Sequence, residues 1–208
     1  MDTFRLAKEQ YTELGSKKMA LLMNKKRHSA NLKFLKQHIL KNKRILDLAC
    51  GYGRLTIPLA KIGYIIEGID LTPNLIKDAK NNAIKENVNI KFKIGNMCYL
   101  PYKDESFDAI ICMWSSFNHL LKKIEQKQSL NEIYRTLRPN GLGIIDLPYF
   151  GKQKKNIRKE IINGVHIISF AHDKDSILNA IEKSKFNEYK IKKEIIGERK
   201  RLIVYLFK

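Results

Sequence analysis

The sequence has little cysteine, little proline and no long apolar run. Its 208 residues include three cysteines, five prolines and one tryptophan. The cysteines Cys50, Cys98 and Cys112 are odd in number and form no CxxC pair, which argues against a disulfide framework or a zinc site. No apolar stretch reaches the roughly 18 residues that a membrane span requires. The N-terminal segment MDTFRLAKEQYTELG also lacks the apolar core of a secretory signal. We therefore expect a cytoplasmic protein with no membrane partner.

Metal-ligand spacing is also missing from the sequence. The five histidines are scattered, and none pairs with another histidine or a cysteine at a spacing typical of metal sites. These residues are His28, His38, His119, His166 and His172. We therefore expect no metal.

Acidic residues are scarce at the two ends of the chain. Residues 1–44 carry 12 Lys and Arg against 3 Asp and Glu, and residues 151–208 carry 15 against 7, whereas residues 45–150 are nearly balanced at 13 against 11. Two basic ends are consistent with an anionic partner such as RNA. However, only 9 of the 40 basic residues are arginine, the better side chain for bidentate phosphate contacts. This composition favours a lysine-rich solvated surface over an RNA footprint.

The order of apolar runs predicts a single α/β domain. Residues 3–14 and 17–40 have helical spacing. From Arg44 on, the runs RILDLAC, YIIEGID, VNIKFKIG, FDAIICMW and GLGIIDLP are typical of strands, and amphipathic stretches separate most of them. Residues 54–62, a segment that starts at Thr72 and Pro73, and residues 123–137 are predicted helices. Strands alternating with helices indicate a Rossmann-like, doubly wound and mostly parallel sheet.

The pattern loosens after Pro148. The stretch YFGKQKKNIRKE is predicted to be exposed and irregular or helical, whereas NGVHIISFAH is consistent with a strand. A helix capped at Asp173 follows. The last two runs, FNEYKIKKEII and RKRLIVYLFK, are close enough in sequence to pair as an antiparallel C-terminal hairpin.

Two glycines and two carboxylates mark the ends of the first two predicted strands. Gly51 and Gly53 follow the strand in ILDLACGYG, where an open parallel sheet binds its ligands and where glycine permits a tight turn. Asp70 ends the second strand, where a carboxylate can accept hydrogen bonds from both hydroxyls of a ribose. Together these features indicate an adenosine-containing cofactor.

Asp47 distinguishes between the possible cofactors. Its carboxylate lies within the first strand, where it would repel a pyrophosphate but suit an ammonium group. A dinucleotide site also favours a third small residue three positions after the second glycine, and that position is Thr56. S-adenosyl-L-methionine carries an ammonium group, a sulfonium and no phosphate. The sequence therefore favours this cofactor over a dinucleotide.

The chain resembles the class I S-adenosylmethionine-dependent methyltransferases, most clearly from Arg44 to Pro148. ILDLACGYG is similar to their motif DxGxGxG, with Ala49 in place of the first glycine, and GID resembles the ribose-binding motif. GNMCYLPYKDESFDAIICMWSSFNHL is similar to their third-strand loop and fourth strand, and LRPNGLGIID to their LKPGG turn. The resemblance implies a seven-stranded sheet whose last strand is antiparallel. It implies one domain over 1–208, with a helical cap at 1–43, a cofactor-binding core at 44–148, and a variable segment and hairpin at 149–208.

The resemblance also implies roles for individual residues. Asp47, Ala49 and Gly51 would lie near the methionine moiety and Asp70 on the ribose. Asn96 and Met97 would lie beside the adenine, and Met113 and Trp114 at the floor of the site. The family often has aspartate where this chain has asparagine, which keeps an acceptor and adds a donor. The full predicted cofactor-binding set is Asp47, Ala49, Cys50, Gly51, Gly53, Asp70, Leu71, Asn96, Met97, Met113 and Trp114.

Acceptor-facing residues are implied by the SSFNHL segment after the fourth strand. Ser115, Asn118 and His119 fall where the family places substrate-facing groups. His119 is the candidate catalytic residue, because an imidazole can accept a proton near neutral pH; its alternative role is packing beneath the next helix. Tyr149, just past the fifth strand, and Tyr11, in the N-terminal helix, are further candidates for lining the pocket.

The implied function is transfer of a methyl group to a nitrogen or oxygen atom of an acceptor by in-line displacement. The segment from Tyr149 to His172 is too short to be a recognition domain, which favours a small-molecule acceptor. One alternative is a tRNA or rRNA methyltransferase that uses the basic ends. Another is a protein that binds the cofactor without turnover.

Overall fold

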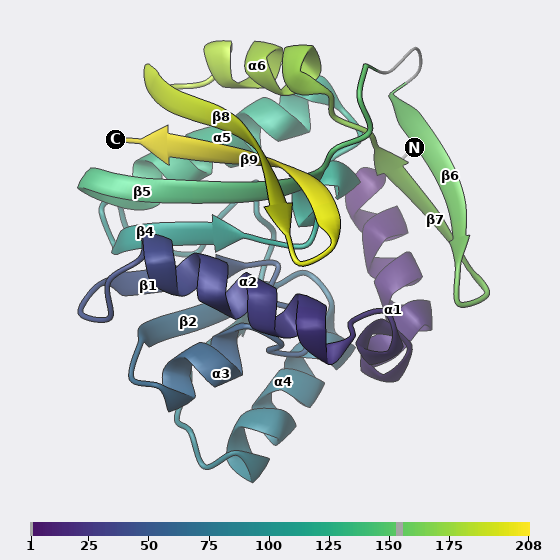
Figure 1. Ribbon diagram of the computed structural model, residues 1–208, viewed down its shortest axis with the longest axis vertical. Helices are drawn as coiled ribbons and strands as arrows, with labels where there is room; N and C mark the ends of the chain where they lie inside the picture. The colour runs from purple at the N-terminus through teal and green to yellow at the C-terminus, as the bar shows by residue number, and fades with distance from the viewer. Residues whose placement is uncertain (1, 153–155) are drawn as a thin grey trace.

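A seven-stranded sheet with helices on both faces organises the protein (Figure 1), for which a computed structural model describes residues 2–152 and 156–208. The strand order is β3-β2-β1-β4-β5-β9-β8. The first five strands are parallel, while β9 is antiparallel to both of its neighbours. Their bounds are β1 Arg44–Leu48, β2 Ile65–Asp70, β3 Phe92–Ile94, β4 Phe107–Cys112, β5 Leu137–Pro148, β8 Glu188–Ile196 and β9 Arg199–Phe207. The predicted doubly wound sheet and its antiparallel C-terminal hairpin are confirmed.

The central strands bury side chains on both faces, which explains their continuous apolar runs. Leu46 and Ile110 pack beneath α5 (Lys123–Thr136) and α6 (Lys174–Glu182). Ile45 and Ile111 point the other way and pack with α2 (Lys25–His38) and α3 (Thr56–Lys61). On this second face, α4 (Pro73–Lys85) covers the β3 edge. Because both faces of these strands are buried, a ligand-binding site can form only at the strand ends.

The N-terminal helices differ from the prediction in one place. The helix α1 (Thr3–Leu21) is kinked at Gly15, whose φ of 62° breaks it between the two predicted helical segments. However, the predicted helix over 17–40 is interrupted after α1 and restarts as α2. The reason is Asn24, which has extended backbone and whose side chain accepts a hydrogen bond from the backbone N–H of Arg27.

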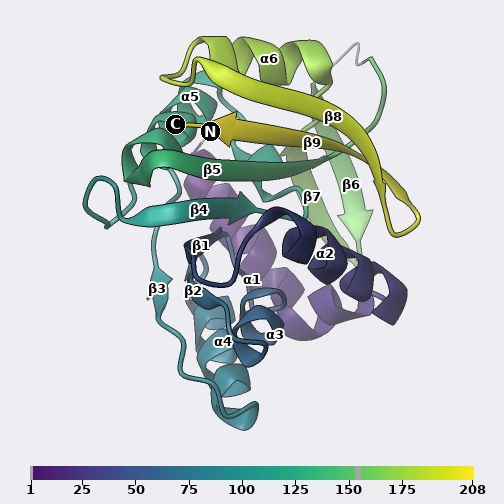
Figure 2. The ribbon, with the colours of Figure 1, turned by 60° about the vertical axis from the view of Figure 1, so that its left-hand side comes forward.

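A second, two-stranded sheet stands beside the main one. Strands β6 (Ile157–Ile162) and β7 (Val165–Phe170) form an antiparallel hairpin, which both views place beside α1 (Figures 1 and 2). Asn163 and Gly164 both have positive φ, as a tight Asn-Gly hairpin turn requires. The prediction of irregular or helical structure over 149–160 is therefore wrong from Ile157 on, because pairing with β7 overrides the local charge pattern. Residues 153–155 of that stretch lie outside the described residues.

Three further features concern a membrane, a metal ion and disulfide bonds. None of the helices in the described part of the chain is long and apolar enough to cross a membrane. Within residues 2–152 and 156–208, no group of His, Cys, Asp and Glu side chains is arranged to hold a metal ion. Cys50, Cys98 and Cys112 are all buried and free of disulfides.

Candidate functional site

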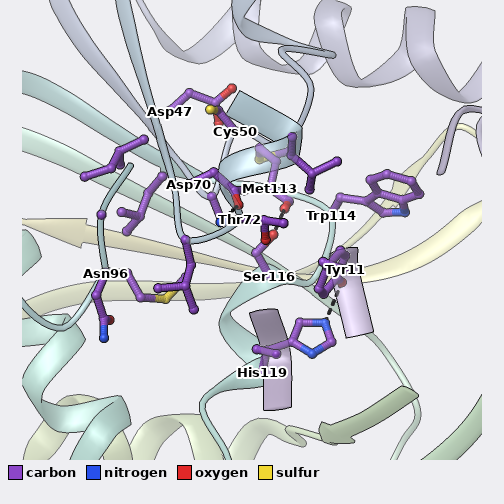
Figure 3. A pocket seen from close by; sticks show the side chains of 18 of the residues that line it. Tyr11, Asp47, Cys50, Asp70, Thr72, Asn96, Met113, Trp114, Ser116 and His119 are labelled. Carbon is purple, nitrogen blue, oxygen red and sulfur yellow. Dashed lines mark hydrogen bonds between the residues drawn. The ribbon is translucent and has the colours of Figure 1, made fainter. Parts of the chain in front are cut away.

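A cavity lies at the carboxyl ends of β1, β2 and β4, where the strand order reverses. Its lining residues come from these strand ends, from α1 and from the loops that follow β1, β2, β3 and β4. In Figure 3, Asn96 lies at one end and Tyr11 and Trp114 at the other. The predicted residues that line this cavity are Tyr11, Asp47, Ala49, Cys50, Asp70, Leu71, Asn96, Met97, Met113, Trp114 and His119. Most of the set predicted from the sequence therefore surrounds one space.

The loop after β1 is shaped by three residues in the left-handed region. Ala49, Gly51 and Gly53 have φ values of 60°, 57° and 83°. A side chain at Gly53 would also place its Cβ 2.7 Å from Cδ1 of Ile57. Ala49 carries a strain of about 1 kcal/mol that glycine would not. Gly51 and Gly53 are not among the residues that line the cavity, and their effect on it is through the path of the loop.

Asp70 joins this loop to the start of α4. Its Oδ2 accepts a hydrogen bond from the backbone N–H of Gly51 at 2.9 Å, and its Oδ1 accepts one from the N–H of Thr72 at 2.8 Å. Burial raises the pKa of Asp70, and these hydrogen bonds oppose the shift. Because each carboxylate oxygen can accept a second hydrogen bond, both remain able to bind hydroxyls in the cavity.

Asp47 is held by a partner that the sequence analysis did not assign to it. The hydroxyl of Thr56 donates to Oδ2 of Asp47 at 2.6 Å. Burial raises the pKa of Asp47 to about 6, while the Thr56 hydrogen bond and the charge of Arg54 oppose the shift. The position that breaks the dinucleotide pattern is therefore the one that orients this carboxylate.

Arg54 is a site residue that sequence reasoning missed. It lines the cavity, and its guanidinium carbon lies 4.9 Å from the ring centroid of Trp114. Burial lowers its pKa, and its Nη1 is buried without a hydrogen-bond partner among the described residues. A buried cationic donor with a free N–H fits a carboxylate ligand. The sequence feature that could have identified Arg54 was its position directly after the glycine pair, in a chain where arginine is scarce.

A strained turn after β4 sets the position of Trp114. Trp114 and Ser115 have φ values of 59° and 69°, an uncommon pair for residues with side chains. Asp146 holds the turn, because its Oδ2 accepts from the N–H of Trp114 at 3.0 Å and its carbonyl from the N–H of Ser115 at 3.0 Å. Arg201 in turn donates to Asp146 at 2.5 Å and to the Ser115 hydroxyl at 2.9 Å. The indole is thereby fixed at the boundary of the cavity.

A second cavity lies on the other side of that boundary, between α1, the β6–β7 hairpin and the ends of β5 and β9. The predicted acceptor-facing residues Ser115 and Asn118 line this cavity, not the first. Four residues line both cavities: Tyr11, Met19, Trp114 and His119.

Two of these shared residues are hydrogen-bonded to each other. The hydroxyl of Tyr11 lies 2.7 Å from Nε2 of His119, with the rings edge to face (Figure 3). Burial lowers the pKa of His119 to about 4, against a smaller opposing effect of the Ile168 backbone, and burial raises the pKa of Tyr11. At neutral pH the phenol is therefore protonated and the imidazole neutral, and the phenol donates in the tautomer that carries its proton on Nδ1. No sequence pattern pairs these residues, which are 108 positions apart.

Tyr149 is placed elsewhere. It lines neither of the two cavities; its N–H donates to the carbonyl of Lys200, and the amine of Lys193 lies 4.6 Å from its ring centroid. The pairing of β5 with β9 keeps this backbone at the sheet, apart from both cavities. The next residue, Phe150, lines the second cavity instead.

Comparison with known proteins identifies the segment that carries this site. Residues 45–141 match the family model described as "Methyltransferase domain". A ubiquinone biosynthesis O-methyltransferase of Coxiella burnetii is 38% identical over 109 residues, which are 52% of this chain and 45% of that protein. A putative methyltransferase of Geobacillus sp. is 38% identical over 105 residues, 50% of this chain and 42% of that protein. The chain thus spans about half the length of these curated relatives.

Solved structures extend the likeness to the whole fold. The 1,6-didemethyltoxoflavin-N1-methyltransferase of Burkholderia thailandensis superimposes with a TM-score of 0.74 at 14% identity, over 98% of this chain and 88% of that one. The PH0226 protein of Pyrococcus horikoshii gives a TM-score of 0.72 at 22% identity, over 88% and 90% of the two chains. Fold and strand-end motifs agree with the family match: residues 45–141, just under half of the chain, match the methyltransferase domain family, and the fold of the whole chain is similar to that of these solved structures.

Proposed function

We propose that the protein transfers the methyl group of S-adenosyl-L-methionine to a nitrogen or oxygen atom of a small-molecule acceptor. The observation that carries this proposal is the boundary between the two cavities, formed by Tyr11, Met19, Trp114 and His119. In-line displacement requires donor carbon and acceptor atom to meet with fixed alignment, and such positioning can contribute about 7–11 kcal/mol. Two cavities lined in part by the same four residues are adjacent, which supports a donor and an acceptor bound next to each other.

The residues of the first cavity fit the proposed cofactor. Asp47 offers a carboxylate for the ammonium group, and Asp70 offers two oxygens for the ribose hydroxyls. The unpartnered Nη1 of Arg54 offers a donor for the carboxylate of the methionine tail. The cofactor would supply an activated methyl group when bound. The protein's part is to orient that group and exclude water from it.

The hydrogen-bonded pair of Tyr11 and His119 provides a path for the acceptor's proton. A hydroxyl acceptor next to Tyr11 would pass its proton to the phenol oxygen, while the phenol proton moves to Nε2 of His119. The neutral state of the imidazole, a result of its burial, leaves this nitrogen able to accept. A neutral amine acceptor becomes positively charged when it is methylated. It would therefore need this pair only to remove its proton after methyl transfer.

The elements around the second cavity support a small acceptor. Its walls come from α1, from a hairpin of two short strands and from the ends of β5 and β9, so the described residues around it form no separate recognition domain. The relatives whose names give a substrate, the ubiquinone-pathway enzyme and the toxoflavin-precursor enzyme, act on small molecules.

The test combines cofactor binding with methyl transfer. Calorimetry should detect binding of S-adenosylhomocysteine, and labelled cofactor should methylate a compound in a small-molecule cell extract. For a hydroxyl acceptor, Tyr11→Phe should lower kcat by roughly 100-fold or more while the affinity for S-adenosylhomocysteine changes little. Tyr149→Phe is the matched control and should leave both unchanged. Absence of cofactor binding, or binding without any methylated product, would contradict the proposal.

A second candidate function is methylation of RNA. It is favoured by the packing of α2 against β8, which brings the two basic ends of the chain to one side of the molecule. RNA binding through lysines should weaken about a thousandfold or more between 50 and 200 mM salt if six or more phosphates are contacted. No measurable tRNA or rRNA binding at 50 mM salt would remove this candidate.

A further inference from the structure

Arginines gather around Trp114. The chain has only 9 arginines among 40 basic residues, yet four of them lie in this region. Arg54 lines the first cavity, Arg199 and Arg201 line the second, and Arg27 lines a narrow hollow that also borders Trp114. Surface solvation does not explain this, because elsewhere the chain uses lysine for that purpose.

The carboxylates near this cluster do not balance it. Asp146 forms a buried ion pair with Arg201. Among the carboxylates, Asp47 has the strongest electrostatic interaction with Arg54. Glu160 and Glu198 are already in ion pairs with Arg158 and Lys26, and Glu194 accepts a hydrogen bond from Tyr205. Glu198 also attracts Arg27, and Asp146 attracts Arg199, but neither arginine forms an ion pair with a carboxylate of the described residues.

Arg199 is the cluster member best placed to bind a ligand. It lines the second cavity, is solvent-accessible and makes no hydrogen bond or ion pair with the described residues. Its pKa is lowered by burial and by the charges of Arg27 and Arg201. Arg201, by contrast, is fixed by Asp146 and Ser115, so it contributes its charge to the cavity from a rigid position.

The side of the second cavity between α1 and the β6–β7 hairpin is apolar. Leu14 and Met19 of α1 face the β6–β7 hairpin, which contributes Ile161, Ile162 and Ile167. A ligand that fills such a space has a hydrocarbon body. The arginines at its β9 edge favour a planar anion, which a guanidinium binds through two parallel hydrogen bonds.

We propose that the acceptor is an organic carboxylate whose hydrocarbon body lies against the β6–β7 hairpin and whose carboxylate is bound by Arg199. This inference rests on the proposed function, because it names the class of molecule that the second cavity receives. The anion neutralises the repulsion among Arg27, Arg199 and Arg201. The carboxylate at one end leaves the other end of the molecule to reach Tyr11 and His119.

The single tryptophan makes this testable without knowledge of the natural acceptor. Trp114 borders both cavities, so its fluorescence reports on each. The protein is first saturated with S-adenosylhomocysteine and then titrated with phenylacetate and with phenylacetamide, and separately with octanoate and octanamide. We expect each acid to bind about tenfold more tightly than its neutral amide, as one charge-assisted contact would provide.

Arg199→Gln should remove this preference for the acid and leave the affinity for S-adenosylhomocysteine unchanged. Lys200→Gln is the matched control: it removes the same charge from the neighbouring residue, whose side chain points to the opposite face of β9. It should keep the preference.

The outcomes separate the two proposals. If S-adenosylhomocysteine fails to bind the unmodified protein, the proposed function is wrong and this inference falls with it. If it binds but neither acid binds better than its amide, or if Arg199→Gln retains the preference, only the carboxylate inference is overturned.

Discussion

The two cavities are built in different ways. The first draws its predicted residues mainly from the consecutive strand ends of β1, β2, β3 and β4, and its key carboxylate, Asp70, is bound by nearby backbone amides. The second is assembled from α1, β6, β7 and β9, and its key contacts join side chains far apart in sequence, such as Tyr11 with His119 and Arg201 with Asp146. The first site is thus encoded locally, whereas the second depends on how distant elements pack.

Asp70→Ala should have the largest effect on the first cavity. It would leave two buried backbone N–H groups without acceptors, at about 1–3 kcal/mol each, and should lower Tm by about 5–15 °C. Loss of the ribose contacts should weaken binding of S-adenosylhomocysteine by roughly 100-fold. Asp70→Asn keeps one acceptor oxygen, so it should lose less stability but a similar part of the affinity. Calorimetry and thermal unfolding check both, and an unchanged affinity in Asp70→Ala would disprove the ribose assignment.

Arg201→Met tests the ion pair with Asp146, which holds the turn at Trp114 beside the second cavity. Removing one member of a buried ion pair leaves Asp146 charged and unpaired, which should cost about 3–5 kcal/mol in urea unfolding. Arg5→Met is the control, because the exposed pair of Arg5 with Glu9 should contribute at most about 1 kcal/mol. Equal effects of the two substitutions would show that Asp146 and Arg201 do not anchor the Trp114 turn.

Acid should change the stability of the protein in opposite directions through its buried histidines and through Asp47. Burial lowers the pKa of His172 to about 3 and of His119 to about 4, so below about pH 6.5 the unfolded chain binds protons that the folded chain does not. Each histidine should therefore cost about 2 kcal/mol of stability between pH 7 and pH 5. Asp47 acts oppositely: its raised pKa, about 6, means that the folded chain binds the extra proton between about pH 4 and pH 6.

Urea unfolding at pH 7 and pH 5 measures this balance. The unmodified protein should lose stability on acidification, His172→Gln should lose less, and Asp47→Asn should lose more. The same loss in all three proteins would contradict the assignment of these buried groups.

Individual elements show how much of the fold could be predicted from the sequence. The strands of the core were predictable because burial on both faces gives short continuous apolar runs, and the Gly51 and Asp70 signals fall directly at their ends. β6 was not predictable, since its charged residues resemble a loop until pairing with β7 supplies their hydrogen bonds. The break after α1 was missed because Asn24 acts through a cap, which hydrophobic spacing does not register.

The sequence by itself determined the order of the core strands and helices, the acids and glycines at the strand ends, and hence the cofactor side. These features depend on contacts within a few residues or on a strand topology with few alternatives. Only the tertiary structure decided that Thr56 orients Asp47, that Tyr11 reaches His119, that Tyr149 turns away, and that four scarce arginines meet around Trp114. The reason is that such contacts depend on the packing of separate elements, and no local pattern of residue types records the distance between side chains that the fold brings together.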